Sequence, residues 1–423
     1  MGKHLSVTPT DCFIDEPITV TVKQLHPFET VELYTEMRDN FGGYWSAHVM
    51  VQADVNGTVD LSKAMPILGS YSTPDAMGLF WSMKRDRFKD NGVRTPLKPL
   101  KTFVTLRRNG AVEEIVTVTR HLLQPSLIRE DVRENGIVGV FYHHGDKRPR
   151  PTLIVLGGSE GGLREGQAAL LAAKGFNAFS LAYFGMKGLP SQLVNIPLEY
   201  FQNALEWLAH RSNVDTNRIG LVGTSKGGEL ALLLASLEPK IKAVAAYVPS
   251  SVVHMGLGEA DNGQAPSSWS LKGKPLPFAF NKEKSKKLTN MIMDQRNAGQ
   301  MISYREWYRV HAEAASEDAF IPVEKINGAV LVISGGDDQL WPSALFGEQV
   351  IERLRRSQFK HSFKHCRYPK AGHAIGYPGM PTTDSTKFVY GSYDLKAGGT
   401  SEDNYRAQAD AWRKTVAFFK EKL

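Results

Sequence analysis

Residues 221–236, LVGTSKGGELALLLAS, place Ser225 between an apolar run and an apolar segment of helical length, with glycines close on either side. The run before the serine is typical of a strand buried on both faces, and the segment after it is typical of a buried helix. Residues 223–227, GTSKG, have the G-x-S-x-G spacing of a sharp strand-to-helix turn that exposes a serine hydroxyl. The stretch therefore predicts an α/β sheet with a candidate nucleophile at the end of one strand.

Strand-like and helix-like segments alternate from about residue 137 onward, which supports a parallel sheet joined by helices. The expected strands are 151–158, 177–185, 218–225, 241–249, 329–336 and 361–369. The expected helices are 165–176, 198–211, 227–237, 346–356 and 407–423. We interpret residues 250–322, which include a Lys-rich stretch and a helix, as an insertion over the carboxyl edge of the sheet and a candidate lid.

The amino-terminal part has short alternating runs separated by turn residues, and none keeps a helical period. These runs are 18–25, 30–37, 45–54, 101–108 and 113–120. Such a rhythm predicts an all-β sandwich or barrel. We therefore expect a β-sandwich domain over residues 1–125 and an α/β domain over residues 126–423.

Composition narrows the function classes. The chain has 423 residues and a formal net charge of +7, but no Lys/Arg block interleaved with aromatic residues, so we expect no nucleic-acid partner. A phosphate-bearing small molecule is a simpler anionic partner, and a solubilising charge excess is the alternative. No stretch of 18 apolar residues is present, and residues 1–13 have neither an apolar leader core nor a cleavage site, so we expect no secretory signal and no membrane partner. Only two cysteines, Cys12 and Cys366, favour a reducing compartment.

A serine hydroxyl needs a base and an acid partner, which hydrolases of this sheet type carry later in the chain, in the order Ser, Asp/Glu, His. The expected strand 329–336 runs into Asp337 and Asp338, and His373 follows the next strand. The spacing G-x-x-D-x-x-x-P, counted from Gly335, favours Asp338 over Asp337 as the partner of His373. We expect His361 and His365, which lie within a strand-like run, to be structural.

The expected oxyanion hole combines the amide of Lys226 with an amide of the loop GGSEGG, residues 157–162, and Gly158 and Ser159 are its candidates. The glycines would also suit an ordinary turn. A phosphate-binding loop is disfavoured because no G-K-[ST] follows.

Longer stretches resemble the family of type I acyl-CoA thioesterases and bile acid-CoA:amino acid N-acyltransferases. In the amino-terminal part the resemblance rests on DEPITVTV (15–22), ADVNGTVDL (53–61) and MGLFWSM (77–83). In the remainder it rests on residues 157–184, 198–208, 219–236 and 407–419. It implies an immunoglobulin-like β-sandwich before an α/β-hydrolase domain, and a triad at Ser225, Asp338 and His373.

The resemblance also implies hydrolysis of an acyl-CoA substrate, with coenzyme A as part of the substrate and no metal or other cofactor. Three alternatives stay open: an amino-acid N-acyltransferase, a carboxylesterase or dienelactone-type hydrolase, and a catalytically silent binding protein. Conjugating members are associated with cysteine at the position of Ser225. The terminal Glu421-Lys422-Leu423 lacks the small first residue of a peroxisomal tripeptide, so we expect a cytoplasmic protein.

The Lys-rich part of the insertion is a candidate contact for the phosphates of coenzyme A, and a solvated basic loop is the alternative. The lysines concerned are Lys272, Lys274, Lys282, Lys284, Lys286 and Lys287.

Overall fold

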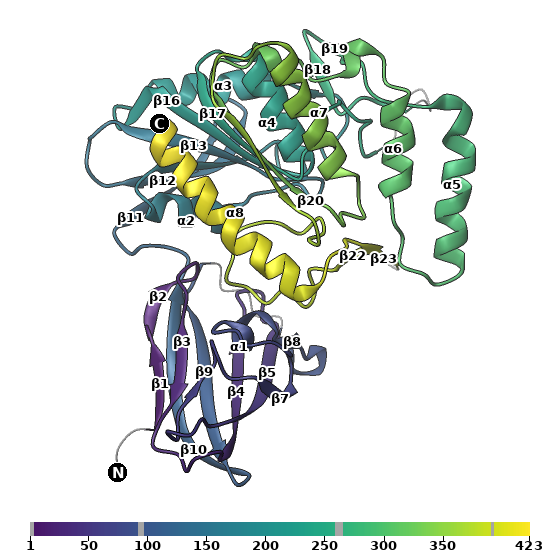
Figure 1. Ribbon diagram of the computed structural model, residues 1–423. Coiled ribbons are helices and arrows are strands. Elements are labelled where there is room, and N and C mark those ends of the chain that lie inside the picture. Colours follow the sequence, from purple (N-terminus) through teal and green to yellow (C-terminus); the bar gives the residue numbers. More distant parts are fainter. Residues whose placement is uncertain (1–3, 92–96, 259–264, 391–392) are drawn as a thin grey trace. The chain divides into compact units, whose positions relative to one another are not determined.

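A computed structural model describes residues 4–91, 97–258, 265–390 and 393–423 (Figure 1). The chain divides into two compact units. The first comprises Met1–Leu123, Tyr377–Thr386 and Thr400–Ala409, and the second comprises Gln124–Gly376, Lys387–Gly399 and Asp410–Leu423. The chain first passes from one unit to the other at residues 123–124, close to the expected boundary between residues 125 and 126. The two later segments of the first unit lie within the range that we expected to belong entirely to the α/β domain.

Long-range hydrogen bonds explain why those segments join the first unit. The guanidinium of Arg120 is fully buried and donates from Nη1 to the carbonyl of Gly379 at 2.7 Å. The amide of Thr382 donates to the carbonyl of Trp81 at 2.9 Å. The ring of Trp81 also stacks on the ring of Tyr405 at 6.0 Å. The two hydrogen bonds give partners to the Nη1 of Arg120 and to the carbonyl of Trp81, and the ring contact adds packing within the same unit.

Two β-sheets form the first unit (Figure 1). One has the order β1-β3-β6, with β1 (Leu5–Thr8), β3 (Thr19–Val22) and β6 (Val59–Asp60). The other has the order β2-β10-β9-β4-β5-β7, with β8 also paired to β5. Its strands are β2 (Asp11–Phe13), β10 (Ala111–His121), β9 (Leu100–Arg108), β4 (Thr30–Arg38), β5 (Tyr44–Gln52), β7 (Pro66–Gly69) and β8 (Lys84–Arg85).

Alternating burial holds these two sheets together. Every second residue of β4 and β5 is buried, as the period of a strand with one core face requires. Val20, Leu33, Val49 and Val104 are fully buried and belong to one cluster that draws on both sheets. The expected β-sandwich is therefore confirmed. The unit also contains a short helix α1 (Gly78–Trp81) and a 3₁₀ turn η1 (Arg87–Lys89), which the alternation did not predict.

An eight-stranded sheet forms the centre of the second unit, in the order β11-β12-β14-β13-β16-β17-β20-β21. β11 and β12 pair antiparallel, β12 pairs antiparallel with β14, and all later neighbours are parallel. The strands are β11 (Leu127–Glu134), β12 (Ile137–His144), β13 (Arg150–Leu156), β14 (Asn177–Ala182), β16 (Val214–Thr224), β17 (Ile241–Tyr247), β20 (Ala329–Gly335) and β21 (Phe363–Tyr368).

Helices connect the parallel strands as the alternation predicted, and the α/β-hydrolase fold class is confirmed (Figure 1). They are α2 (Glu165–Ala173), α3 (Glu199–Ala209), α4 (Lys226–Leu237) and α7 (Ser343–Arg356). The last helix, α8 (Ser401–Lys422), follows all the strands, and its residues up to Ala409 belong to the first unit. Among the described residues, no helix is long and apolar enough to cross a membrane.

The insertion between β17 and β20 contains helices and short strands joined by irregular segments, and its residues 259–264 lie outside the described part. Its strands β18 (Trp269–Leu271) and β19 (Lys274–Pro275) form a small sheet with β15 (Ile196–Pro197). Its helices are α5 (Lys282–Asn297) and α6 (Arg305–Glu313), which pack against each other, and the 3₁₀ turns η2 (Glu317–Ala319) and η3 (Val323–Lys325) follow. A hairpin of β22 (Lys387–Tyr390) and β23 (Tyr393–Lys396) precedes α8.

Candidate active site

Ser225 stands alone between the end of β16 and the start of α4, with φ 59° and ψ −123°. An L-residue rarely adopts this conformation, so the surrounding structure must hold it. Its amide donates to the carbonyl of Tyr247 at 2.9 Å, and its carbonyl accepts from the amides of Gly228 and Glu229 at 2.8 and 3.0 Å. The turn is thus fixed from the neighbouring strand and from its own helix.

The glycines of the motif are required by close backbone contacts. A Cβ on Gly223 would lie 1.9 Å from the carbonyl oxygen of Gly227. A Cβ on Gly227 would lie 2.1 Å from the carbonyl oxygen of Gly157, at the end of β13. No side chain fits at either position. Residues 223–227 therefore form a nucleophile turn in its geometry as well as in its sequence.

Ser225, His373 and Asp338 form a continuous hydrogen-bonded chain. The Oγ of Ser225 lies 2.9 Å from Nε2 of His373, and Nδ1 of His373 lies 2.8 Å from Oδ2 of Asp338. Because the buried carboxylate only accepts, Nδ1 carries the proton and Nε2 is left as an acceptor for the serine hydroxyl. The arrangement can take a proton from Ser225.

Buried contacts fix both partners of the serine. Asp338 is fully buried, and its Oδ1 accepts from the amides of Leu340 and Trp341 at 3.0 and 3.2 Å. His373 is 5% exposed, and its amide donates to the carbonyl of Ala397 at 2.8 Å. The carboxylate therefore meets its hydrogen-bond demand without water, which keeps it aimed at the imidazole.

The neighbouring Asp337 points into a different network. Its Oδ2 accepts from the amide of Gly399 at 2.8 Å, and its Oδ1 accepts from Nε2 of Gln339 at 2.7 Å. The structure places Asp338, and not Asp337, beside His373. Of the other candidate histidines, His365 bonds the hydroxyl of Ser334 at 2.7 Å and His361 contacts the ring of Phe359.

The segments expected to supply an oxyanion hole lie at the serine. Lys226 is the first residue of α4, so its amide is one of the four that no helix carbonyl can accept. Gly158 packs against the turn, since a Cβ there would lie 3.2 Å from the Cβ of Ser225. Ser159 follows at the exposed turn after β13.

The amide of Gly158 already has an acceptor. It donates to Oε1 of Glu160 at 3.2 Å, and Arg164 forms an ion pair with the same carboxylate. A developing oxyanion that used this amide would have to replace Glu160. Glu160 was visible in the sequence as the only charge in GGSEGG, but its reach back to the Gly158 amide depends on the loop conformation.

Aromatic rings adjoin the histidine. Trp341 and Phe388 lie edge-on to the ring of His373 at 5.9 and 6.4 Å. The indole of Trp341 donates to the carbonyl of Val248 at 2.9 Å, which anchors it. No local pattern predicts the proximity of these rings to His373, because Trp341, His373 and Phe388 lie in three separate segments of the chain and Phe388 belongs to β22.

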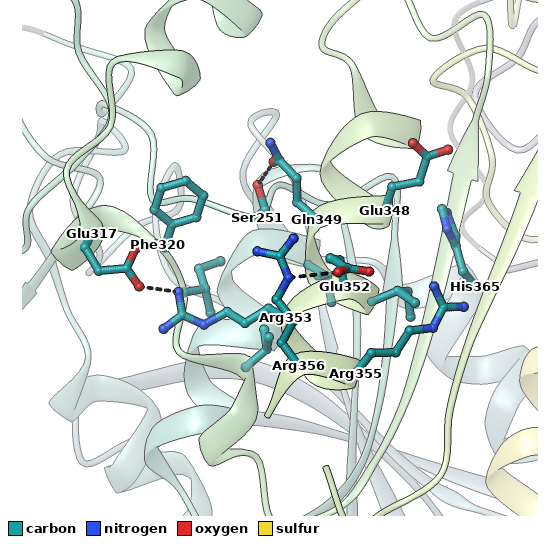
Figure 2. Close-up of a pocket in the computed structure, with 14 residues that line it drawn as sticks. Ser251, Glu317, Phe320, Glu348, Gln349, Glu352, Arg353, Arg355, Arg356 and His365 are labelled. Carbon is teal, nitrogen blue, oxygen red and sulfur yellow. Dashed lines mark hydrogen bonds and ion pairs between the residues drawn. The ribbon is translucent and has the colours of Figure 1, made fainter. Parts of the chain in front are cut away.

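A cavity of about 770 Å³ lies elsewhere in the second unit (Figure 2). It is lined by α7, by residues of η2 and η3 and by His365. Two ion pairs join residues of its lining: Arg353 with Glu317, and Arg356 with Glu352. None of the described residues that line it belongs to the hydrogen-bonded chain of Ser225. Within the described ranges, no group of three or more His, Cys, Asp or Glu side chains could hold a metal ion.

Fold and site together define a protein of the α/β-hydrolase class with a serine at its nucleophile turn. Residues 196–423 match the family description "BAAT / Acyl-CoA thioester hydrolase C terminal", and residues 15–134 match "Acyl-CoA thioester hydrolase/BAAT N-terminal region". The chain therefore belongs to the BAAT/acyl-CoA thioester hydrolase family.

Curated relatives match along nearly the whole chain. Human "Acyl-coenzyme A thioesterase 2, mitochondrial" is 30% identical and covers 97% of this chain and 82% of its own. Mouse "Acyl-coenzyme A thioesterase 1" is 31% identical, and the match covers 97% of this chain and 94% of the mouse protein. Among solved structures, a "Dienelactone Hydrolase-like Promiscuous Phospotriesterase P91" from metagenomic libraries covers 70% of this chain and 99% of its own, at 16% identity and a TM-score of 0.42, too distant to support an argument.

The two adjacent aspartates provide a matched pair of variants. Asp338→Asn should slow the reaction of Ser225 with a serine-directed phosphonate by roughly 10³ to 10⁴, because the amide no longer holds the useful tautomer of His373. Asp337→Asn should slow it less than about tenfold, because it touches only loop contacts. Rates followed by intact-protein mass spectrometry check this. Equal losses, or a larger loss in Asp337→Asn, would show that the hydrogen bond to Asp338 has no catalytic role.

Proposed function

We propose that this chain is an acyl-CoA thioesterase, a serine hydrolase that converts acyl-CoA and water to a free acid and coenzyme A. The observation that carries the proposal is the hydrogen-bonded chain from Ser225 through His373 to Asp338, at a nucleophile turn in a member of this family. Acyl-CoA is the substrate, coenzyme A is part of it, and the reaction requires no metal and no prosthetic group.

The proposed reaction begins with attack of the Ser225 Oγ on the thioester carbonyl carbon. The hydroxyl proton passes to Nε2 of His373, which lies 2.9 Å away, while Asp338 holds Nδ1–H and stabilises the imidazolium. The carbon–sulfur bond then breaks, the sulfur takes the proton from Nε2, and coenzyme A leaves. The products of this half are an acyl ester on Ser225 and neutral His373.

Water completes the cycle by the reverse arrangement. His373 accepts a proton from a water that attacks the ester, and returns it to the Oγ of Ser225 as the acid leaves. In both halves the carbonyl oxygen becomes an oxyanion. The amide of Lys226, together with that of Gly158 or Ser159, is proposed to stabilise it, and donors of this kind contribute roughly 10² to 10³ in rate.

The remaining expectations stay predictions. A cytoplasmic location, and the absence of a nucleic-acid or membrane partner, rest on the sequence. The two cysteines are buried and unpaired, which is compatible with a reducing compartment.

Two substrates assayed side by side, an acyl-CoA and a p-nitrophenyl ester, test the proposed function. Wild-type enzyme should release equal amounts of coenzyme A and free acid from acyl-CoA, with a higher kcat/KM than for a p-nitrophenyl ester. Ser225→Ala should lose about three orders of magnitude or more with its thermal unfolding unchanged, as loss of a nucleophile does. A preference for the neutral ester would favour the carboxylesterase alternative. A Ser225→Ala variant that retains a tenth of the rate would contradict the mechanism.

The fate of the acyl group distinguishes hydrolysis from transfer. An amine attacks a thioester much more readily than an oxygen ester, whereas hydroxide discriminates little between them, so a seryl ester should go to water. With millimolar glycine present, we expect wild-type enzyme to form free acid as nearly its only product. Ser225→Cys should raise the ratio of N-acyl glycine to free acid, even if the total rate falls.

Mass spectrometry of the products measures that ratio. Abundant N-acyl glycine from the wild type would move the protein to the N-acyltransferase alternative. An unchanged ratio in Ser225→Cys would show that amine binding, and not the leaving group of the acyl-enzyme, controls the outcome.

The basic part of the insertion is a proposed contact for the phosphates of coenzyme A. Its six lysines are exposed, and four of them lie on the first turns of α5. That helix packs against α6, where the ring of Tyr308 lies 5.4 Å from Trp341, and Trp341 adjoins His373. A line of contacts thus connects the proposed reaction centre with the lysines.

Charge reversal tests this contact. Lys284→Glu with Lys287→Glu should raise KM for acyl-CoA about three- to tenfold at low salt, less at high salt, and leave KM for a neutral ester unchanged. Lys360→Glu with Lys364→Glu changes two exposed lysines outside the insertion and is the matched control. Equal effects on both substrates, or equal effects of the two double variants, would count against phosphate contact.

A further inference from the structure

A fully buried ion pair stands on the first turn of the helix that follows Ser225. The ammonium of Lys226 lies 2.6 Å from Oε1 of Glu229, and the two side chains are 2% and 0% exposed. Burial lowers the pKa of Lys226 and raises the pKa of Glu229, while each charge opposes that change in the other. Removing both charges from water carries a large desolvation penalty, which the attraction between them does not always offset. A contribution to stability is therefore a weak explanation for this buried pair.

The carboxylate of Glu229 joins the helix to the insertion. Its Oε1 also accepts from the indole nitrogen of Trp269 at 2.8 Å and from the amide of His254 at 3.4 Å. The ammonium of Lys226 donates to the carbonyl of His254 at 3.4 Å. One carboxylate oxygen therefore connects α4 with the segment after β17 and with β18.

The same contacts lead to the loop on the other side of Ser225. The ring of Trp269 lies 5.7 Å from the ring of Tyr183. The hydroxyl of Tyr183 donates to the carbonyl of Gly157 at 2.7 Å, at the start of the loop that packs against the serine. Glu229 is thus linked on one side to Lys226 and on the other, through two buried rings, to the backbone of residues 157–162.

We propose that Glu229 is a positioning residue for the oxyanion hole. Its carboxylate bonds neither the substrate nor the side chain of Ser225, although the backbone amide of Glu229 donates to the carbonyl of Ser225 at 3.0 Å. It holds the side chain of Lys226, which fixes the orientation of the amide at that residue, and it holds Trp269, which supports the Gly157 loop from behind. This inference rests on the proposed function, because it assumes that the amides on these two segments receive the oxyanion.

Moving an oxyanion-hole amide out of position should lower kcat less than removing that amide altogether. Removal of one oxyanion donor typically lowers kcat by 10² to 10³, so loss of Glu229 should lower it by about 10- to 100-fold. An effect confined to the insertion would instead raise KM, and a purely structural effect would lower only thermal stability. The three possibilities therefore differ in what they change.

The main test variant removes both charges together, so that neither Lys226 nor Glu229 remains as an unpaired buried charge. Lys226→Met with Glu229→Gln replaces the buried pair by neutral groups of similar size, a change that often costs little stability. Glu229→Gln alone reports the effect of a buried, unpaired Lys226. Glu324→Gln, which breaks the ion pair with Arg353 on α7, is the matched control.

We expect the double variant to keep a thermal midpoint close to that of the wild type. Its kcat, and its rate of reaction with a small serine-directed phosphonate, should both fall about 10- to 100-fold, with KM for acyl-CoA within about twofold. Glu324→Gln should change neither rate. If the double variant fails to fold, Trp269→Phe decides, because it removes one donor to Glu229 but keeps the ring beside Tyr183; both rates should fall in the same proportion.

The proposal would be overturned if a folded variant reacted with the phosphonate at the wild-type rate and kept the wild-type kcat, whether or not its KM was raised. The phosphonate also separates this proposal from the proposed function, since its tetrahedral oxygen uses the same amides but its reaction does not require acyl-CoA. Slower phosphonylation in the variants, with no acyl-CoA hydrolysis by the wild type, would leave Glu229 as a positioning residue and contradict the thioesterase assignment.

Discussion

The close approach of Gly227 to the carbonyl oxygen of Gly157 is the constraint on which the site depends. With 2.1 Å available to a Cβ, only glycine lets α4 begin directly against the end of β13. That approach brings three things to one place: Ser225 at a strained φ of 59°, the first amides of a helix, and the loop after β13. Backbone hydrogen bonds hold Ser225 in this strained conformation: its amide donates to Tyr247 of β17, and its carbonyl accepts from two amides of α4. These bonds lie in the buried interior of the unit and offset the strain.

Asp338, Lys226 and Glu229 are buried charged groups close to the turn, and other protein groups hold each of them. Asp338 is fully buried and accepts from two turn amides as well as from His373. Lys226 and Glu229 form an ion pair on the first turn of α4, the helix that follows the serine. Glu160 differs, because its carboxylate is exposed and bonds the amide of Gly158 on the loop after β13. The site therefore combines buried charges close to the serine with one exposed carboxylate on that loop.

How much of the fold and of the site the sequence predicts depends on how far apart in the chain the interacting residues are. Buried parallel strands have local signatures, so β13, β16, β17 and β20 were located to within a few residues, and the order Ser225, Asp338, His373 followed from strand ends. Contacts between distant segments have no such signature. Arg120 reaches Gly379 across 259 residues, and this places part of the carboxyl-terminal chain in the first unit. The link from Glu229 to Trp269 spans 40 residues and a separate small sheet, and no local pattern in the sequence predicts it.

The central claim is that an acyl group passes from coenzyme A to the oxygen of Ser225. The most direct measurement is rapid acid quenching of the enzyme mixed with acyl-CoA, followed by intact-protein and peptide mass spectrometry. The account predicts a transient gain of one acyl mass on the peptide that contains Ser225, formed together with a burst of coenzyme A. Steady release of coenzyme A with no acyl-enzyme at any time, or an acyl group on another residue such as Cys366, would contradict it.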